Sequence, residues 1–480
     1  MSHEGTLSVL LPPEPAARTR WATEELLARL GLRYRLLPAE AAVGAVALAI
    51  GRELPPGAAG VELMGTSPVA QVTAELQAGR APAPASTGPA GRLRLDVSLE
   101  DLFEEWLAWR GACAGEWSWA ESGRSGEEPA GRRELRVGRR PAADLLAEAV
   151  GAALEAAARS SGLVTPPRVP RWPDGRRFAV HLSHDVDYLD GRSLLWMRYA
   201  GWTARAGLAL ARGQVRSAQE SLSRIRRWLG EKGDPQAGVP ILMAAERAAG
   251  ARSTFYFLIK TSSYSRGERI GRLYSVRTPY VRRLMAEVAR SGWEVGVHGR
   301  YPTFISAAGL GREKRLLEEA AQVPVRGVRQ HCLHLRLPQT FRAQEEAGFS
   351  YDATVGWNDD AGFRGGTCLP YRVWDAEARR PLRLWEIPLT FQDVALQHAR
   401  GPVAGWTPAL APIRRDIERL GGVLSASFHT NWVDPVDFPG ALDWYRDLLA
   451  ELGEAGGWLT HGADIVQAEE SYRRSLAPTE

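Results

Sequence analysis

Two aspartates stand close together at the end of a short apolar stretch, Phe178-Ala-Val-His-Leu-Ser-His-Asp-Val-Asp187. Alternate side chains of an extended strand share a face, so Ser183, Asp185 and Asp187 are expected to point to the same side. Neighbouring carboxylates repel, and each raises the pKa of the other unless a cation lies between them or one stays protonated. The stretch therefore predicts a metal site or a carboxylate that acts as a base. The structural alternative is a solvated turn in which the aspartates cap a helix.

Histidines end three other strand-like stretches, at His298, His331 and His429. By the same alternation, Arg329 shares the face of His331. A carboxylate and imidazoles that leave one position open form the ligand set of a catalytic zinc-type site, and a second carboxylate and a histidine nearby could move protons. These side chains are the minimum set for hydrolysing an amide or an ester.

Each of these residues also has a structural interpretation. His298 could be a core histidine with satisfied hydrogen bonds, although the glycines beside it indicate close backbone approach. His331 could be a ligand, a substrate contact or a structural hydrogen-bonding group, and His429 could form a pocket wall. Arg329 could pair with a carboxylate for stability alone.

The elements that would position these side chains are short strands that alternate with helical segments. The predicted strands cover residues 178–183, 253–259, 294–298, 327–331, 351–355, 384–389, 423–429 and 458–460. This alternation is typical of a parallel sheet or barrel, and the carboxyl ends of barrel strands converge on one face. We therefore predict an α/β fold with a distorted (β/α)7-8 barrel over residues 174–480, with the polar strand ends at one mouth.

The first part of the chain, residues 1–165, predicts a smaller N-terminal α/β domain of unknown role. Residues 7–11 are strand-like, and apolar residues recur at helical spacing in residues 22–30, 99–110 and 141–158. Residues 80–90 and 120–133 have the composition of loops. The proline-rich segment 165–173 breaks the pattern, and we place the domain boundary there.

Composition excludes several classes of protein. The chain has 480 residues, and 60 basic against 56 acidic residues leave a net charge of +4, which is too small to indicate a nucleic-acid partner or a membrane surface. Cys113, Cys332 and Cys368 form no disulfide framework and no Cys-x-x-Cys zinc site. No apolar run is long enough to span a bilayer and the first residues show no secretory signal, so we expect a cytoplasmic protein without a transmembrane segment. The oligomeric state is not predicted.

From about Asp174 onwards the chain resembles the polysaccharide deacetylase superfamily, also called carbohydrate esterase family four or the NodB-homology fold. The motifs that carry the resemblance are Ser183-His-Asp-Val-Asp187, Trp293-Glu-Val-Gly-Val-His-Gly299, Val328-Arg-Gln-His331 and Ser427-Phe-His-Thr-Asn431. The resemblance implies that Asp185 is the general base, that Arg329 orients it and that His429 is the general acid. It also implies that Asp187 and His298 bind a divalent metal, first of all Zn²⁺, with Co²⁺, Ni²⁺ or Mn²⁺ as alternatives.

One position departs from the family pattern. The family's second motif carries another histidine where this chain has Pro302, so His331 is the candidate for the missing ligand. Further along, Gly362-Phe-Arg-Gly-Gly-Thr-Cys-Leu-Pro370 resembles an uncharacterised subgroup of the superfamily that carries an extra N-terminal domain.

Four more residues are candidates for a role at the site. Arg364 could meet an anionic group of the substrate, and Trp357 and Trp432 could stack on sugar faces. Asp393 could orient a histidine of the site or could cap a helix.

The resemblance implies a metal-dependent hydrolase that removes N-acetyl or O-acetyl groups from a sugar or glycoconjugate, in exopolysaccharide or cell-envelope glycan synthesis. Hydrolysis of a non-sugar amide or a cyclic imide is one alternative. A catalytically silent carbohydrate-binding barrel is another, and Pro302 motivates it. The expected partner is a carbohydrate or glycoconjugate substrate, with no nucleic acid.

Overall fold

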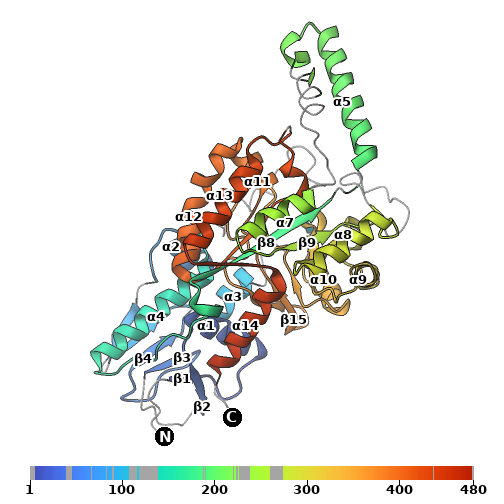
Figure 1. Cartoon of the computed structure of the whole chain (residues 1–480). Coiled ribbons are helices and arrows are strands. Elements are labelled where there is room, and N and C mark those ends of the chain that lie inside the picture. The colour runs from blue at the N-terminus through green and yellow to red at the C-terminus, as the bar shows by residue number, and fades with distance from the viewer. Residues whose placement is uncertain are drawn as a thin grey trace.

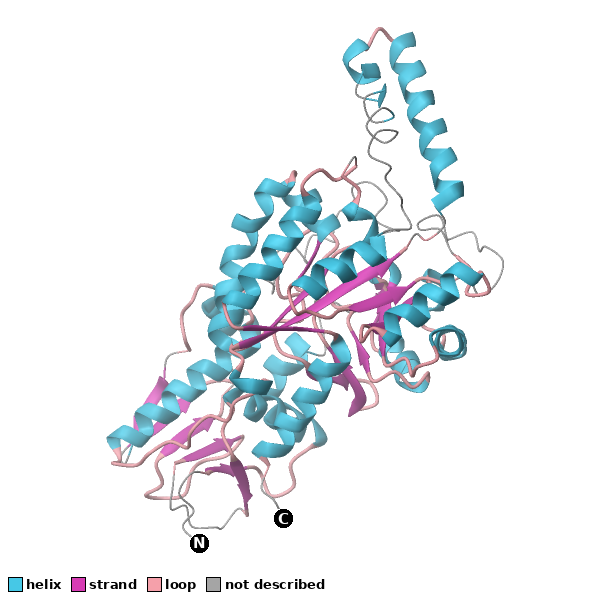
Figure 2. Ribbon diagram, in the orientation of Figure 1, coloured by secondary structure: helices cyan, strands magenta, loops and turns pink. Residues whose placement is uncertain are grey.

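The computed structural model describes residues 6–38, 46–65, 67–82, 84–88, 91–107, 116–117, 139–187, 189, 191–219, 221–222, 225, 238–259, 274–435 and 437–477. Within them, a six-stranded sheet near the N-terminus lies beside a ten-stranded sheet with helices around it (Figure 1, Figure 2). The predicted loop 120–133 and Cys113 lie outside the described residues.

The first sheet has the strand order β2-β1-β3-β4-β6-β5 and is parallel except for the β5–β6 pair. Its elements, with the associated helices, are β1 (Leu7–Leu10), α1 (Ala17–Leu30), β2 (Tyr34–Leu37), β3 (Ala47–Ile50), β4 (Gly60–Leu63), α2 (Val69–Gln77), β5 (Pro84–Gly88), β6 (Arg92–Leu95), α3 (Leu99–Leu107), β7 (Glu116–Trp117) and α4 (Ala142–Ser160). The strand and the three helices predicted for this region are confirmed.

The loop predicted over residues 80–90 is wrong in its second half, because residues 84–88 form strand β5. This edge strand pairs antiparallel with β6, with Thr87 opposite Leu93. An edge strand is hydrogen-bonded to a single neighbour and tolerates residues that are rare in central strands. The Ala-Pro-Ser composition of this segment therefore did not indicate a strand.

The second sheet contains every strand predicted after residue 173. Its elements and their helices are β8 (Phe178–Val186), α5 (Gly191–Ala211), α7 (Gly238–Ala248), β9 (Thr254–Phe257), α8 (Pro279–Arg290), β10 (Glu294–Gly299), α9 (Ala307–Ala321), β11 (Gly327–Gln330), β12 (Leu335–Arg336), α10 (Gln339–Glu346), β13 (Tyr351–Asp352), β14 (Tyr371–Asp375), β15 (Arg380–Glu386), β16 (Phe391–Gln392), α11 (Asp393–Arg400), α12 (Trp406–Leu420), β17 (Val423–Ser427), α13 (Ala441–Glu454), β18 (Gly457–Thr460) and α14 (Gly462–Leu476). Strand β12 lies outside this sheet and pairs with β7.

This sheet curls until its two ends meet. The strand order is β14-β15-β13-β11-β10-β9-β8-β17-β16, with β18 also paired to β8. The segment between β15 and β16 connects the ends, since Leu389 N–H donates to Val355 O and Thr390 N–H donates to Ser425 O. The distorted barrel that the sequence predicts is therefore confirmed, with the segment between β15 and β16 linking its two sides.

Strand β8 lies in the middle of the curled sheet and is buried along its whole length. It pairs with β17 on one side and with β9 and β18 on the other. Two of its polar residues form hydrogen bonds with strand β17: His181 Nδ1 lies 2.9 Å from Ser425 Oγ, and Ser183 Oγ donates to Ala426 O at 2.6 Å. A strand fixed this firmly holds Asp185, near its end, in one position.

Helix α4 connects the first sheet to the barrel through the buried carboxylate of Asp144. Asp144 accepts hydrogen bonds from Arg29 Nε at 3.0 Å, Thr367 Oγ1 at 2.9 Å and Cys368 N–H at 2.7 Å. Arg29 also binds Glu25 at 2.7 Å. Burial raises the pKa of Glu25, but Arg473 and Arg29 lower it by more, to about 2. The two sheets are therefore joined by paired charges, and whether residues 1–165 form a separate domain stays a prediction.

Asp144→Asn should lower the free energy of unfolding by about 1–3 kcal/mol, because a buried donor loses its charged acceptor while Arg29 keeps Glu25 as its partner. Urea denaturation of the whole chain measures the change. Glu155→Gln is the matched control, since its pair with Arg159 is exposed at 3.9 Å and should contribute less than about 1 kcal/mol. Equal effects of the two substitutions would contradict a stabilising role of Asp144.

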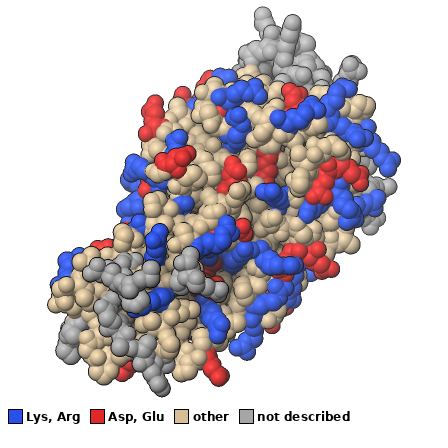
Figure 3. Space-filling view, turned by 60° about the horizontal axis from the view of Figure 1, so that its bottom comes forward, with Lys and Arg blue, Asp and Glu red and all other residues tan. Residues whose placement is uncertain are grey.

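The surface carries charges of both signs. On the face shown in Figure 3, basic and acidic side chains are interspersed, in keeping with the small net charge. Among the described residues, no helix is both long enough and apolar enough to cross a membrane.

Candidate active site

The polar strand ends meet at one mouth of the barrel, around a cavity of 190 Å³. The ends of β8, β10, β11 and β17 supply the site residues, as the alternation of strands and helices predicts. The cavity is lined by Asp185, Asp187, His298, His331, Cys332, Leu333, Asn358, Gln392, Val394, His429, Asn431 and Trp432. It is smaller than an ordinary small-molecule pocket, which holds at least about 300 Å³.

Asp187, His298 and His331 form a buried group that could hold a metal ion. Asp187 Oδ1 lies 3.4 Å from His298 Nε2 and 3.6 Å from His331 Nδ1, and the two nitrogens lie 3.0 Å apart. A tetrahedral ion with bonds of about 2.0–2.1 Å needs ligand atoms roughly 3.3–3.4 Å apart. The three atoms therefore fit one face of such a tetrahedron.

Two further observations favour a cation between these side chains. Asp187 Oδ1 is buried and has no hydrogen-bond partner among the described residues. His298 Nδ1 lies 2.9 Å from Arg329 O, and since a carbonyl only accepts, Nδ1 carries the hydrogen and Nε2 keeps its lone pair. Burial lowers the pKa of His298 more than Asp185 and Asp187 raise it, which also favours the neutral ring that binds metals.

A tight turn after β11 brings His331 to this group. The two residues that follow it, Cys332 and Leu333, have φ values of 58° and 52°, in the left-handed region that non-glycine residues rarely adopt. Strand β11 also pairs with β10 so that Arg329 lies opposite His298. Pro302, at the position of the missing histidine, is exposed and does not line the cavity.

Asp185 is held by Arg329 from the neighbouring part of the barrel. Arg329 is fully buried, donates to Asp185 Oδ1 at 2.9 Å and to Ala353 O at 2.8 Å, and stacks over the Tyr256 ring at 4.6 Å. Burial raises the pKa of Asp185, but His298, Arg329 and His429 lower it by more, so the carboxylate stays ionised. Oδ2 faces the cavity, 3.7 Å from His298 Nε2.

His429 lies across the cavity and is held by Asp393. Asp393 is fully buried, with Oδ1 2.6 Å from His429 Nδ1 and Oδ2 accepting the His429 backbone N–H at 2.6 Å. His429 Nε2 is left facing Asp185 Oδ2 at 3.9 Å. Burial lowers the pKa of His429, but Asp393, Asp185 and Asp187 raise it to about 10, so the ring is protonated at neutral pH.

Asp393→Asn should move the basic limb of the kcat/KM profile to lower pH. The Asp393 carboxylate raises the pKa of His429 more than any other charge does, so without it the ring loses its proton at a lower pH. The expected loss of kcat is about 10–100-fold. Rates of amide hydrolysis between pH 6 and 10 measure both effects. An unshifted basic limb would show that His429 is not the group that titrates there.

The predicted substrate residues divide into two groups. Trp432 lines the cavity and stacks on Phe438, with ring centroids 4.0 Å apart. Arg364 is buried, donates to Gly356 O at 2.8 Å and lies 5.2 Å from the Trp357 ring. Neither Arg364 nor Trp357 lines the cavity, so their roles toward a substrate stay predictions.

Six cavity residues were not among the sequence candidates, and two of them, Asn358 and Gln392, are linked amides. Gln392 Nε2 donates to Asn358 Oδ1 at 3.0 Å, and Asn358 Nδ2 donates to Cys332 O at 3.0 Å. These amides connect strand β16 to the turn after His331. A neutral amide has no distinctive spacing along the chain, so only the position of Asn358 just before the glycine-rich segment could have suggested it.

His184, between the two motif residues Ser183 and Asp185, points away from the cavity into a buried polar cluster. Its Nε2 lies 2.6 Å from Glu246 Oε1, and its Nδ1 lies 2.6 Å from Phe428 O, the carbonyl before His429. Glu246 also accepts from Tyr445 Oη at 2.7 Å. His184 therefore supports the backbone on both sides of the site, as a packing residue outside the cavity.

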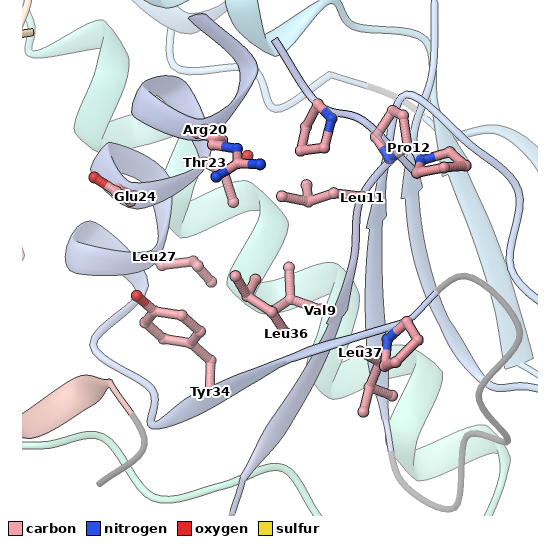
Figure 4. A pocket seen from close by; sticks show the side chains of 13 residues that line it. Val9, Leu11, Pro12, Arg20, Thr23, Glu24, Leu27, Tyr34, Leu36 and Leu37 are labelled. Atoms are coloured by element: carbon pink, nitrogen blue, oxygen red, sulfur yellow. The ribbon is translucent and has the colours of Figure 1, made fainter. Parts of the chain in front are cut away.

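A second cavity, of 280 Å³, lies between helix α1 and strands β1 and β2 (Figure 4). Its lining is mainly apolar and includes Val9, Leu11 and Leu27, with Arg20, Glu24 and Tyr34 as polar groups. The residues that line it include no histidine or cysteine, so the candidate hydrolytic site is the cavity of the barrel.

Comparison with known proteins gives similarity of structure alone. No family model matches the chain, and no curated protein matches it. Among solved structures, a protein assigned as a polysaccharide deacetylase from Mycobacterium smegmatis aligns at a TM-score of 0.41 and 19% identity, over 64% of this chain and 95% of that one.

Two other structures show the same kind of likeness. The polysaccharide deacetylase Bc1974 from Bacillus cereus aligns at a TM-score of 0.28 and 11% identity, over 59% of this chain and 92% of that one. A pseudoenzyme of the CE4 family from Bacillus anthracis aligns at 0.30 and 10%, over 60% and 65%. These three structures, all at low identity, are described as polysaccharide deacetylases or as a member of the CE4 family.

Proposed function

We propose that the chain is a metal-dependent deacetylase of the polysaccharide deacetylase superfamily, which hydrolyses the N-acetyl group of a sugar or glycoconjugate. One observation carries the proposal: around a single cavity stand a buried Asp-His-His group, an ionised carboxylate held by Arg329 and a protonated histidine held by Asp393. Those are the three functions that amide hydrolysis needs, namely an electrophilic site, a base and an acid.

Asp187, His298 and His331 would hold the metal, most simply Zn²⁺ for one carboxylate and two imidazoles. When bound, such an ion supplies Lewis acidity that polarises a carbonyl and makes water more acidic. This chain's own residues would then move the protons.

Asp185 takes a proton from the attacking water at Oδ2, because Oδ1 is engaged by Arg329. The water oxygen bonds to the acetyl carbon, and the carbon–nitrogen bond breaks. His429 gives its Nε2 proton to the departing nitrogen, because Nδ1 is engaged by Asp393. The products are acetate and an amine, and the Asp185–His429 separation of 3.9 Å leaves both groups within reach of one reacting centre.

The cavity favours a small acyl group at the end of a larger substrate. A volume of 190 Å³ holds an acetamido group and part of its sugar, while the rest of a glycan would lie outside. Trp432, in the cavity wall, offers an aromatic face for the sugar.

The purified whole chain, loaded with Zn²⁺, should release acetate from an N-acetylated oligosaccharide, and a chelator should stop the release. A small cyclic imide and a non-sugar acetamide, assayed alongside, separate the sugar deacetylase from the imide or amide hydrolase. Acetate release that a chelator leaves unchanged would remove the metal from the proposal. Metal binding without hydrolysis of any of the three would favour a silent carbohydrate-binding barrel instead.

A further inference from the structure

Helix α5 stands away from the body of the molecule (Figure 1, Figure 2). It begins at Gly191, four residues after Asp187, so it leaves the barrel on the side of the cavity. Its 21 residues correspond to a length of about 31 Å. We call residues 191–219, with Ser221 and Leu222, the arm.

The arm exposes a large share of the apolar surface of the protein. Among the described residues, eight large hydrophobic side chains are exposed. Four of them belong to the arm, where they lie within a stretch of fifteen residues: Leu208 at 52%, Leu210 at 55%, Val215 at 57% and Leu222 at 50%. Single exposed leucines need no explanation, but four exposed apolar side chains on one projecting element indicate an interaction surface.

One face of α5 is already occupied. Trp202, Ala206 and Ala209 are buried and recur at helical spacing. Leu208 and Leu210 lie outside this buried face. Their exposed side chains are therefore not part of the face that α5 already packs.

The charge of the arm is mainly positive, although Glu220 stands between its residues 219 and 221 in the sequence. Residues 191–219 contain five arginines and no acidic residue, although the chain as a whole has nearly as many acids as bases. Arg205 and Arg212 are exposed and lie three residues before and four after Leu208, which places all three on one side of the helix. The net charge of +4, too small to indicate a membrane surface, hides this local excess.

We propose that the arm binds the surface of a bilayer that contains anionic lipid. Arginines beside exposed leucine and valine are the side chains that an anionic interface attracts, because the cations meet the headgroups while the apolar groups enter the boundary of the acyl chains. A polyanion in solution would use the arginines and leave the leucines in water. Binding through the arm holds the barrel mouth close to the membrane, and the proposal does not depend on the hydrolytic function.

The test is sedimentation of the whole chain with vesicles of phosphatidylcholine, with and without about 30% phosphatidylglycerol. The anionic vesicles should bind at least about tenfold more tightly, and salt should weaken the binding. The triple variant Arg205→Gln, Arg212→Gln, Arg216→Gln should bind about 100-fold more weakly, at roughly fivefold per arginine. Leu208→Ser with Leu210→Ser should cost about tenfold.

The matched control removes three exposed arginines from the hairpin of β14 and β15, as Arg379→Gln, Arg380→Gln and Arg383→Gln, and should keep wild-type binding. Circular dichroism shows that each variant is folded. The proposal is wrong if wild-type protein ignores the anionic lipid, or if the arm and hairpin variants lose binding equally. It is also overturned if the chain forms a dimer without binding vesicles and the two serine substitutions make it monomeric, because the arm then joins two copies.

Discussion

Asp185→Asn should lower kcat by about 10²–10⁴-fold, which is the usual contribution of a general base. The amide cannot take a proton from water at the cavity face, although it keeps the shape of the carboxylate. Asp187, His298 and His331 are untouched, so the bound metal should stay at the wild-type level. Acetate release and metal content, measured on the same preparation, check both expectations.

Asp443→Asn is the control, because its side chain is 78% exposed on helix α13 and lies outside the cavity. Since Asp185→Asn also leaves the buried Arg329 opposite a neutral group, circular dichroism must show that the variant is folded before rates are compared. If the folded variant keeps wild-type activity, Asp185 is not the base.

His331→Ala should weaken metal binding by at least about 100-fold. Removing a residue that only hydrogen-bonds to a metal ligand already lowers the affinity by up to about 100-fold, and His331 is proposed as a ligand itself. Two ligands would remain, and no other histidine or acid of the described chain joins Asp187 and His298 in a group of this kind. Competition with a fluorescent chelator measures the affinity, and acetate release should fall with it at limiting metal.

His398→Ala, at an exposed position on α11, is the matched control and should leave the affinity unchanged. Wild-type affinity in the His331→Ala protein would mean that the third ligand comes from elsewhere. Addition of excess Zn²⁺ distinguishes the two roles of the side chain, because activity lost through weak binding returns and activity lost through chemistry does not.

The strands could be predicted because each is a short apolar run bounded by breakers. Strand β8 is buried on both faces, so its sequence stays apolar up to the polar residues that serve the site. Strand β5 could not be predicted, because it is held by backbone pairing to β6 alone. Whether the chain closes as a barrel depends on Leu389 and Thr390, whose hydrogen bonds reach Val355, after β13, and Ser425, in β17.

The sequence by itself determined which residue types end the strands, and therefore that Asp185, Asp187, His298 and His429 would gather at one mouth. It left His331 with three possible roles, as a metal ligand, a substrate contact or a structural hydrogen-bonding group. The direction of a side chain that follows a strand depends on the conformation of the next turn, which the sequence pattern does not specify. The left-handed turn at Cys332 and the pairing of β11 with β10 place its Nδ1 3.0 Å from His298.

Only the tertiary structure decided the partners that set the charge of each group. Asp393 meets His429 from 36 positions away and Arg329 meets Asp185 from 144. Such contacts leave no periodicity in the chain, because they arise when the sheet curls and brings distant strand ends together. The residues of the site follow from local pattern, and their protonation follows from closure of the barrel.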